Sequence, residues 1–260
     1  MNNPLISIIT VVYNGASTLE QTILSVINQT YKNIEYIIID GGSTDGTVDI
    51  IKKYEKHLAC WVSEPDKGIY DAMNKGIDKV TGDWINFMNS GDTFSSNDII
   101  QQLFIQDLFH NHKSIIYGNR IVKQNDGLLK QESRLNTIKY RMDIFHQSCF
   151  VPTFLHKNTK FDISYKIAGD YDFFYKMIDD NVQFIKTDLY LCIFLYGGIS
   201  SNEVNQQIKE VMQVINTHNN SCFHKSKYLF LSISYEYYIA RFLKTYMPFI
   251  YKFVKKHLKK

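Results

Sequence analysis

Short apolar runs alternate with helical patterns through the first third of this chain, and this alternation limits the folds that it can adopt. The apolar runs, rich in Ile and Val, are residues 5–12, 34–39, 58–62 and 84–88. Apolar residues recur at helical spacing between them, at residues 16–29, 48–54 and 69–80. Continuous apolar runs indicate strands that are buried on both faces. Strands and helices that alternate through short connections predict an α/β fold with a mainly parallel, Rossmann-like sheet flanked by helices.

The pattern becomes less regular after residue 92. We expect helices at residues 97–109, at 169–178 and from about 202, and extended segments at 114–117, 121–123, 145–151, 182–186 and 190–195. No linker rich in Pro, Gly or Ser separates the two halves. We therefore predict one domain over residues 1–224, in which residues 1–95 bind a nucleotide and residues 96–200 hold the second substrate.

The C-terminal segment, residues 225–260, differs from the rest of the chain in charge. It carries nine Lys/Arg residues against one acid, Glu236, which leaves 20 of the 29 basic and 25 of the 26 acidic residues for residues 1–224. Apolar residues from Phe249 to Leu258 share one helical face, and lysines occupy the remainder. Such a basic amphipathic helix predicts attachment to an anionic membrane surface, with docking on the catalytic domain as the alternative. Nucleic acid is disfavoured as a partner because the acidic body offers no basic groove.

The cysteines and the N-terminal sequence indicate the cytoplasm. The four cysteines are far apart and lie in apolar contexts, as expected of buried, reduced thiols. The run at residues 5–12 is too short for a signal peptide and lacks a basic flank. The late apolar stretch is interrupted by charged residues before it reaches the roughly 18 residues that a membrane span needs. We expect a cytoplasmic protein, peripheral on a membrane.

Two polar motifs follow predicted strands, where open α/β sheets bind their ligands. The first, at residues 40–47, reads Asp-Gly-Gly-Ser-Thr-Asp-Gly-Thr and matches neither the dinucleotide-binding nor the Walker pattern. It is either a ligand-binding loop with Asp40 at its start or a turn in which Asp45 or Ser43 caps the next helix. The second motif is Asn89-Ser90-Gly91-Asp92. Its carboxylate, at the mouth of a buried strand, can hold a divalent cation against a phosphorylated ligand.

Together with three further motifs, this pair resembles family 2 glycosyltransferases. The matching segments are residues 11–14, 40–47, 67–76, 82–85 and 89–92, which agree in order and spacing from about residue 4 to 93 and more loosely to about 200. The resemblance implies a GT-A fold, a UDP-sugar donor, Mn²⁺ or Mg²⁺, and inversion at the anomeric carbon. It also implies transfer of a hexose or N-acetylhexosamine to a cell-surface glycan, such as O-antigen or capsule. The acceptor would be lipid-linked, at the inner face of a bacterial plasma membrane.

The resemblance also implies roles for single residues on the donor side. Thr10, Val11 and Tyr13 would line the base pocket, and Asp40 would contact the uracil. The other implied donor-binding residues are Asp71, Asn74, Ser90 and Gly91. Asp92 would bind the metal, and it is the one acid left from the family's Asp-x-Asp-Asp pattern. The sequence departs from the family in two further places: Asp-Asp-Gly-Ser has become Asp-Gly-Gly-Ser, and Met73 replaces an arginine whose charge Lys67 or Lys75 could supply.

In the second half, the resemblance points to an acid–base group. Asp170 matches the aspartate at the start of a family helix and would remove the proton from the acceptor hydroxyl. Its alternative role is a helix N-cap, and Asp172 is the substitute base, although we expect it to face solvent. His146 and Gln147 resemble a pair that would contact the acceptor or the donor sugar. A glycine-rich segment at residues 197–200 would close over the diphosphate, or would be an ordinary turn.

Two other functions remain open on the sequence. A sugar-nucleotide nucleotidyltransferase shares the broad architecture, but it needs a basic, glycine-rich loop near the start, which Val12-Tyr13-Asn14-Gly15 does not supply. A non-catalytic nucleotide-binding module tethered to the membrane is the other alternative. The absence of acids at Asn89 and Gly91 keeps this alternative open.

Overall fold

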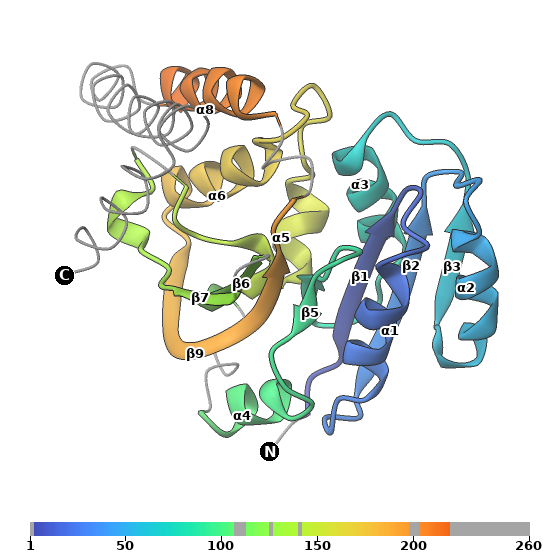
Figure 1. Cartoon of the computed structure of the whole chain (residues 1–260). Coiled ribbons are helices and arrows are strands. Elements are labelled where there is room, and N and C mark those ends of the chain that lie inside the picture. The colour runs from blue at the N-terminus through green and yellow to red at the C-terminus, as the bar shows by residue number, and fades with distance from the viewer. Residues whose placement is uncertain (1–2, 107–112, 125–126, 140–141, 198–202, 219–260) are drawn as a thin grey trace, which may run out of the picture.

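The structure, a computed structural model, describes residues 3–106, 113–124, 127–139, 142–197 and 203–218. One nine-stranded sheet runs through this part of the chain in the order β3-β2-β1-β4-β8-β6-β9-β5, with β7 paired to β6. Helices pack against the sheet (Figure 1). Both halves expected from the sequence thus contribute strands to a single sheet.

The first half forms a parallel sheet, as its alternating pattern predicts. Its strands are β1 (Ile6–Val12), β2 (Ile34–Asp40), β3 (Cys60–Ser63) and β4 (Trp84–Phe87). The connections contain α1 (Leu19–Ile27), α2 (Thr47–Lys53), η1 (Glu55–His57) and α3 (Ile69–Lys79). Every residue of β1 is buried because neighbouring strands lie on both sides and helices lie above and below.

The second half of the sheet is mixed. Strands β6 (Ser114–Gln124) and β9 (Gln183–Leu195) are parallel to each other, and β8 (Cys149–Pro152) runs antiparallel to both β6 and β4. The remaining elements are β5 (Thr93–Phe94), β7 (Gly127–Gln131), α4 (Ile99–Ile105), η3 (Leu135–Thr137), η4 (His146–Ser148), α5 (Thr153–Asn158), α6 (Gly169–Asp179) and α8 (Val204–His218).

Three sequence predictions for this half need correction. The two short strands expected around Gly118 are one strand, because β6 continues through a register irregularity between Tyr117 and Arg120. Likewise β9 is continuous where two strands were expected. The extended run at 145–151 begins with the 3-10 turn η4 before β8 starts.

The sheet separates two hydrophobic cores. One core contains residues of α3, α5, α6 and α8, and the other contains residues of α1, α2 and α4. Alternate residues of β1 point into different cores: Ile9 and Val11 into the first, Ile8 and Val12 into the second. This division follows from the two-residue repeat of a strand. The polar motifs at residues 40–47 and 89–92 lie at the edge of the sheet where β1, β2 and β4 end.

Helix α8 fixes the start of α6. The carboxylate of Glu210 accepts hydrogen bonds from the backbone N–H groups of Lys166, Ile167 and Ala168, at 2.8–3.1 Å. These bonds hold the segment that leads into α6 and therefore position Asp170 in its first turn. The predicted basic helix lies outside the described residues, as does most of the 197–200 segment. No helix in the described part of the chain is long and apolar enough to cross a membrane.

Candidate active site

The loop after β4 meets the turn before β8. Because β4 and β8 are antiparallel, residues that follow β4 lie beside residues that precede β8. The side chain of Asn86 fixes this junction by donating to the carbonyls of Gln147 (3.0 Å) and Cys149 (2.9 Å). Two segments more than 50 residues apart in sequence therefore form one polar surface.

Asp92 is a buried carboxylate at this junction. Its residue is 5% exposed; Oδ2 accepts from Gln147 Nε2 at 2.9 Å and Oδ1 accepts from the Leu195 N–H at 3.1 Å. Burial raises the pKa of Asp92 to about 6, although these hydrogen bonds and the positive charge of nearby Arg120 act in the opposite direction. A cation bound here would offset the cost of burying the charge.

The residues of this turn fit a magnesium or manganese ion. Asn89 Oδ1, three residues before Asp92, is buried and has no hydrogen-bond partner among the described residues. Carboxylate and amide oxygens are ligands that these hard cations prefer, and phosphate and water oxygens complete their coordination. The described residues contain no group of three or more His, Cys, Asp or Glu that could hold a metal. A metal at Asp92 would therefore depend on oxygen atoms from a phosphorylated ligand.

Asp170 is linked to the same junction through His146. Its Oδ2 lies 2.7 Å from His146 Nδ1, and the other imidazole nitrogen, Nε2, lies 3.2 Å from Asn89 Nδ2. Oδ1 of Asp170 accepts from the Tyr171 N–H at 2.9 Å. Tyr70 Oη lies 3.0 Å from that oxygen but only 2.6 Å from the Ile167 carbonyl, and it has one proton to donate. With that proton on the Ile167 carbonyl, Asp170 Oδ1 keeps a lone pair for a further donor.

Two expectations about α6 are corrected. Asp170 lies inside the helix, after Gly169, and the N-cap residue is Ala168, so the N-cap role for Asp170 is wrong. Asp172 does not face solvent: it is 3% exposed and forms ion pairs with Lys176 (2.7 Å) and His218 (3.0 Å). Asp172 therefore holds α6 against α8 and lies apart from the junction.

The residues that the sequence assigned to the base pocket differ in their exposure to solvent. Tyr13 is 67% exposed just after β1, whereas Val11 is buried. Thr10 is fully buried, with its hydroxyl donating to the Met88 carbonyl at 2.7 Å. Asp40 is also fully buried, and its carboxylate accepts from Ser43 N (3.0 Å) and Ser63 Oγ (2.6 Å), among other donors. Neither the Thr10 nor the Asp40 side chain has surface available to a ligand.

The remaining expected donor-binding residues make local contacts in this structure, and their role toward a donor stays a prediction. Both polar atoms of the Asn74 side chain bond to the Phe161 backbone, at 2.9 and 3.0 Å. Asp71 accepts from the Lys67 N–H at 3.0 Å. Ser90 Oγ lies 3.1 Å from Thr18 Oγ1. Gly91 has a positive φ of 101°, which favours glycine at this turn.

The two lysines proposed to replace the family's arginine lie in different environments. Lys75 forms an ion pair with Glu64 at 2.9 Å, whereas Lys67 is exposed. A third cation, Arg120 on β6, lies here and was not predicted from the sequence. Its guanidinium carbon lies 3.6 Å from the centre of the Phe145 ring, and its charge interacts with both Asp92 and Asp170. A single arginine within a buried strand was the signal that could have revealed it.

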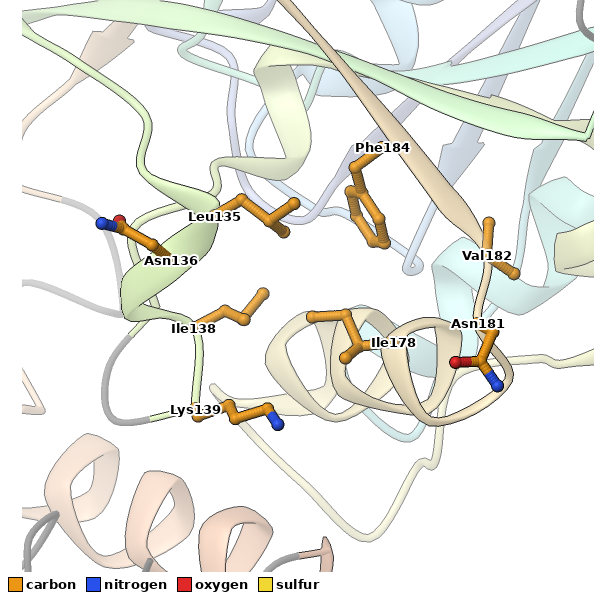
Figure 2. Close-up of a pocket in the computed structure, with 8 residues that line it drawn as sticks. All are labelled: Leu135, Asn136, Ile138, Lys139, Ile178, Asn181, Val182 and Phe184. Carbon is orange, nitrogen blue, oxygen red and sulfur yellow. The ribbon is translucent and has the colours of Figure 1, made fainter.

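A separate pocket lies away from this junction, between η3 and the turn that joins α6 to β9 (Figure 2). Its volume is about 360 Å³, and apolar side chains such as Leu135, Ile138, Ile178 and Phe184 line it. None of the residues predicted from the sequence lines this pocket. The polar junction at the end of β4 is therefore the candidate active site.

Solved structures share this fold. Staphylococcus aureus TarS (residues 1–349, in complex with UDP-GlcNAc) superposes with a TM-score of 0.66 and 19% identity, covering 82% of this chain and 66% of that one. The mannosyltransferase PcManGT from Pyrobaculum calidifontis, in complex with GDP-Man and Mn²⁺, superposes with a TM-score of 0.65 and 17% identity. The match covers 82% of this chain and 64% of that one. This chain thus spans slightly less than two thirds of each, and the agreement confirms the predicted GT-A fold.

A family model, together with sequence relatives, identifies the family. A PGL/p-HBAD biosynthesis glycosyltransferase of Mycobacterium tuberculosis is 27% identical over 216 residues, covering 80% of this chain and 83% of the relative. An uncharacterized glycosyltransferase of Rickettsia typhi is 28% identical over 221 residues, covering 80% of this chain and 69% of the relative. The family model Glycosyl transferase family 2 matches residues 7–179. Together with the fold and the carboxylates at the end of β4, this match shows that the chain belongs to glycosyl transferase family 2.

Proposed function

We propose that this glycosyltransferase moves one sugar, a hexose or N-acetylhexosamine, from a UDP-sugar to a hydroxyl of a lipid-linked cell-surface glycan, with inversion and with help from Mn²⁺ or Mg²⁺. The observation that carries the proposal is the junction itself. It brings a buried carboxylate suited to a metal, Asp92, close to a second carboxylate, Asp170, that is placed in a helix and bonded to His146. Such a pair supplies the two groups that sugar transfer from a nucleotide needs: a ligand for the metal ion and a base for the acceptor hydroxyl.

The metal ligand, Asp92, would act on the leaving group. Asp92, with Asn89 Oδ1 beside it in the same turn, would hold the cation against the diphosphate. A bound cation supplies positive charge that stabilises the departing nucleoside diphosphate. Gln147 keeps the Asp92 carboxylate in place through its bond to Oδ2. The neighbouring structures bound to UDP-GlcNAc, or to GDP-Man and Mn²⁺, support a nucleotide-sugar donor of this kind.

The base, Asp170, would act on the acceptor. In an inverting transfer, one base removes the proton of the attacking hydroxyl. Asp170 is our candidate because Oδ1 keeps a lone pair, while His146 holds Oδ2 in one orientation. The acceptor oxygen bonds to the anomeric carbon as the bond from that carbon to the diphosphate oxygen breaks. The acceptor proton passes to Asp170, and UDP leaves with the electron pair of the broken bond. Asp172 is excluded as the base because Lys176 and His218 hold it away from the junction.

The acceptor and its location complete the proposal. Membrane attachment would come from the basic segment at residues 225–260, of which the sequence alone gives the charge pattern. A peripheral position on the inner face of the bacterial plasma membrane would bring the site to a lipid-linked acceptor.

Transfer and hydrolysis of a panel of UDP-sugars, with and without Mn²⁺, test this function. We expect Asp92→Ala to lose metal-stimulated turnover and Asp170→Asn to lose transfer while it keeps UDP binding. Asp78→Asn is the matched control, because Asp78 is an exposed carboxylate paired with Lys160 outside the site. If both site variants turn over UDP-sugars like the parent, the assigned roles are wrong. A parent that binds UDP but never transfers a sugar would favour a nucleotide-binding module.

A further inference from the structure

His146 lies between the two carboxylate-bearing parts of the candidate active site. Its Nδ1 atom is 2.7 Å from Asp170 Oδ2 on α6, and its Nε2 atom is 3.2 Å from Asn89 Nδ2 in the turn that contains Asp92. The His146 side chain is 17% exposed and that of Asp170 is 8% exposed, so water competes little for these contacts. One imidazole ring therefore connects the proposed base to the proposed metal site.

The two contacts together fix which imidazole nitrogen carries the proton. The amide nitrogen of Asn89 can only donate a hydrogen bond, so Nε2 of His146 accepts and carries no proton. Nδ1 then carries the proton and donates it to Asp170, whose ionised carboxylate can only accept. A neutral histidine in this form satisfies both neighbours, whereas a proton on Nε2 would face the N–H groups of Asn89.

This arrangement also fixes the orientation of the Asn89 amide. With Nδ2 bonded to His146, the amide oxygen Oδ1 lies on the other side of the group, where it is buried and has no hydrogen-bond partner in the described part of the chain. A bound ion or water would explain a buried polar atom of this kind. The Asp92 N–H donates to the Asn89 carbonyl at 2.9 Å, so Oδ1 belongs to the same tight turn as the proposed metal ligand.

We propose that His146 is a positioning residue that couples the base to the metal site. Asp170 selects the Nδ1-protonated form of His146, and this form holds the Asn89 amide with its oxygen free for the metal ion. The inference rests on the proposed metal-assisted transfer, and it gives His146 a role that needs no contact with a sugar. A group that orients a metal ligand contributes to metal affinity although it does not touch the ion.

An Asp170→Asn substitution should reverse the whole arrangement. The Tyr171 N–H donates to Asp170 Oδ1 at 2.9 Å, so the new amide oxygen takes that side and the new Nδ2 faces His146. Nδ1 of His146 then accepts, the proton moves to Nε2, and Nε2 becomes a donor. The Asn89 amide must turn over to accept from it, which pairs Oδ1 with His146 and removes this oxygen from the metal site.

Nitrogen-15 NMR of the metal-free full chain at neutral pH reads the form of His146 directly, because protonated and unprotonated imidazole nitrogens resonate far apart. The His146 signals are assigned by their loss in His146→Phe. We expect the proton on Nδ1 in the parent and on Nε2 in Asp170→Asn. Asp78→Asn is the control, because it makes the same change in an exposed carboxylate outside the site. A doubly protonated ring in the parent, or one form in both chains, would overturn the proposal.

The Mn²⁺ affinity of the UDP-bound chain, measured by calorimetry, tests the effect on the metal site. Loss of the Asp170 charge weakens Mn²⁺ binding whatever residue stands at position 146. Loss of the amide orientation adds to this only when His146 is present. We therefore expect Asp170→Asn to weaken Mn²⁺ binding about tenfold more in the parent than in a His146→Phe chain. Equal effects in the two backgrounds would contradict the coupling.

His146→Asn separates the two contacts of the imidazole. Asparagine places its amide where Nδ1 of histidine lies, so it can still donate to Asp170 but does not reach Asn89. We expect His146→Asn and His146→Phe to lose Mn²⁺ affinity alike, about tenfold, while His146→Asn loses less of kcat at saturating Mn²⁺. Parent-like Mn²⁺ affinity in His146→Asn would refute the positioning role. A parent chain whose UDP binding and transfer do not respond to Mn²⁺ would instead refute the proposed metal dependence, since the NMR comparison judges His146 without the metal.

Discussion

His156 makes the stability of this protein depend on pH in a way that can be calculated from its environment. The side chain lies on α5, is 2% exposed, and stacks on Phe173 of α6 with 4.1 Å between ring centroids. Its Nδ1 has no hydrogen-bond partner within the described residues. Burial alone lowers the pKa of His156 from 6.5 to about 3.

The sign and size of the effect follow from this shift. In the unfolded chain His156 takes up a proton as the pH falls below 6.5, but in the folded protein it stays neutral until about pH 3. The unfolded state therefore binds more protons in this window, and stability is lost as the pH falls. At about 1.4 kcal/mol per pKa unit, the loss between pH 7 and pH 5 is about 2 kcal/mol.

Urea unfolding of the parent and of His156→Phe at pH 5, 6 and 7 measures this contribution. Phenylalanine keeps the stack on Phe173 and cannot titrate. Asp92, whose pKa is raised to about 6, acts in the opposite direction, since its protonation favours the folded state as the pH falls. The difference between parent and variant removes this and other shared contributions. A difference in unfolding free energy that stays constant between pH 7 and pH 5 would refute the reasoning.

Three further substitutions test whether a residue contributes to metal binding or to the stability of the fold. Gln147→Leu should weaken Mn²⁺ affinity about tenfold, measured by Mn²⁺ titration of transfer, because a group that orients a metal ligand is lost; unchanged affinity would contradict this role. Asn74→Ala should cost about 2 kcal/mol of unfolding free energy, through two lost bonds to Phe161, and leave UDP binding intact; weaker UDP binding would place Asn74 in the donor site. Glu210→Ala should lower the free energy of unfolding by about 2 kcal/mol, and the thermal midpoint by several degrees, because it leaves N–H groups before α6 unpaired. An unchanged midpoint would contradict this.

The regular first half of the fold could be predicted because its signals are local. The three helices and four strands up to β4 lie within a few residues of their predicted bounds. The second half was harder to predict because its elements are short or irregular. Strand β5 has two residues, and β6 passes through Gly118 and Asn119, which look like a break in the sequence pattern. Pairing with β9 keeps this segment extended despite its weak propensity.

The candidate site shows a similar limit. Motifs drew attention to Asp92, His146 and Asp170 one at a time, but no local pattern could pair Asp92 with Gln147 across 55 positions.

The antiparallel contact between β4 and β8 also restricts how this enzyme could be recombined with others. Trp84 pairs with Pro152 and Ile85 with Val151, and this short register, together with the Asn86 hydrogen bonds, sets the position of Gln147 relative to Asp92. A slip of one residue would turn the side chains of β8 to the opposite face of the sheet. A chimera that takes a new acceptor half from a different transferase should therefore keep residues 84–92 and 146–152 from one parent.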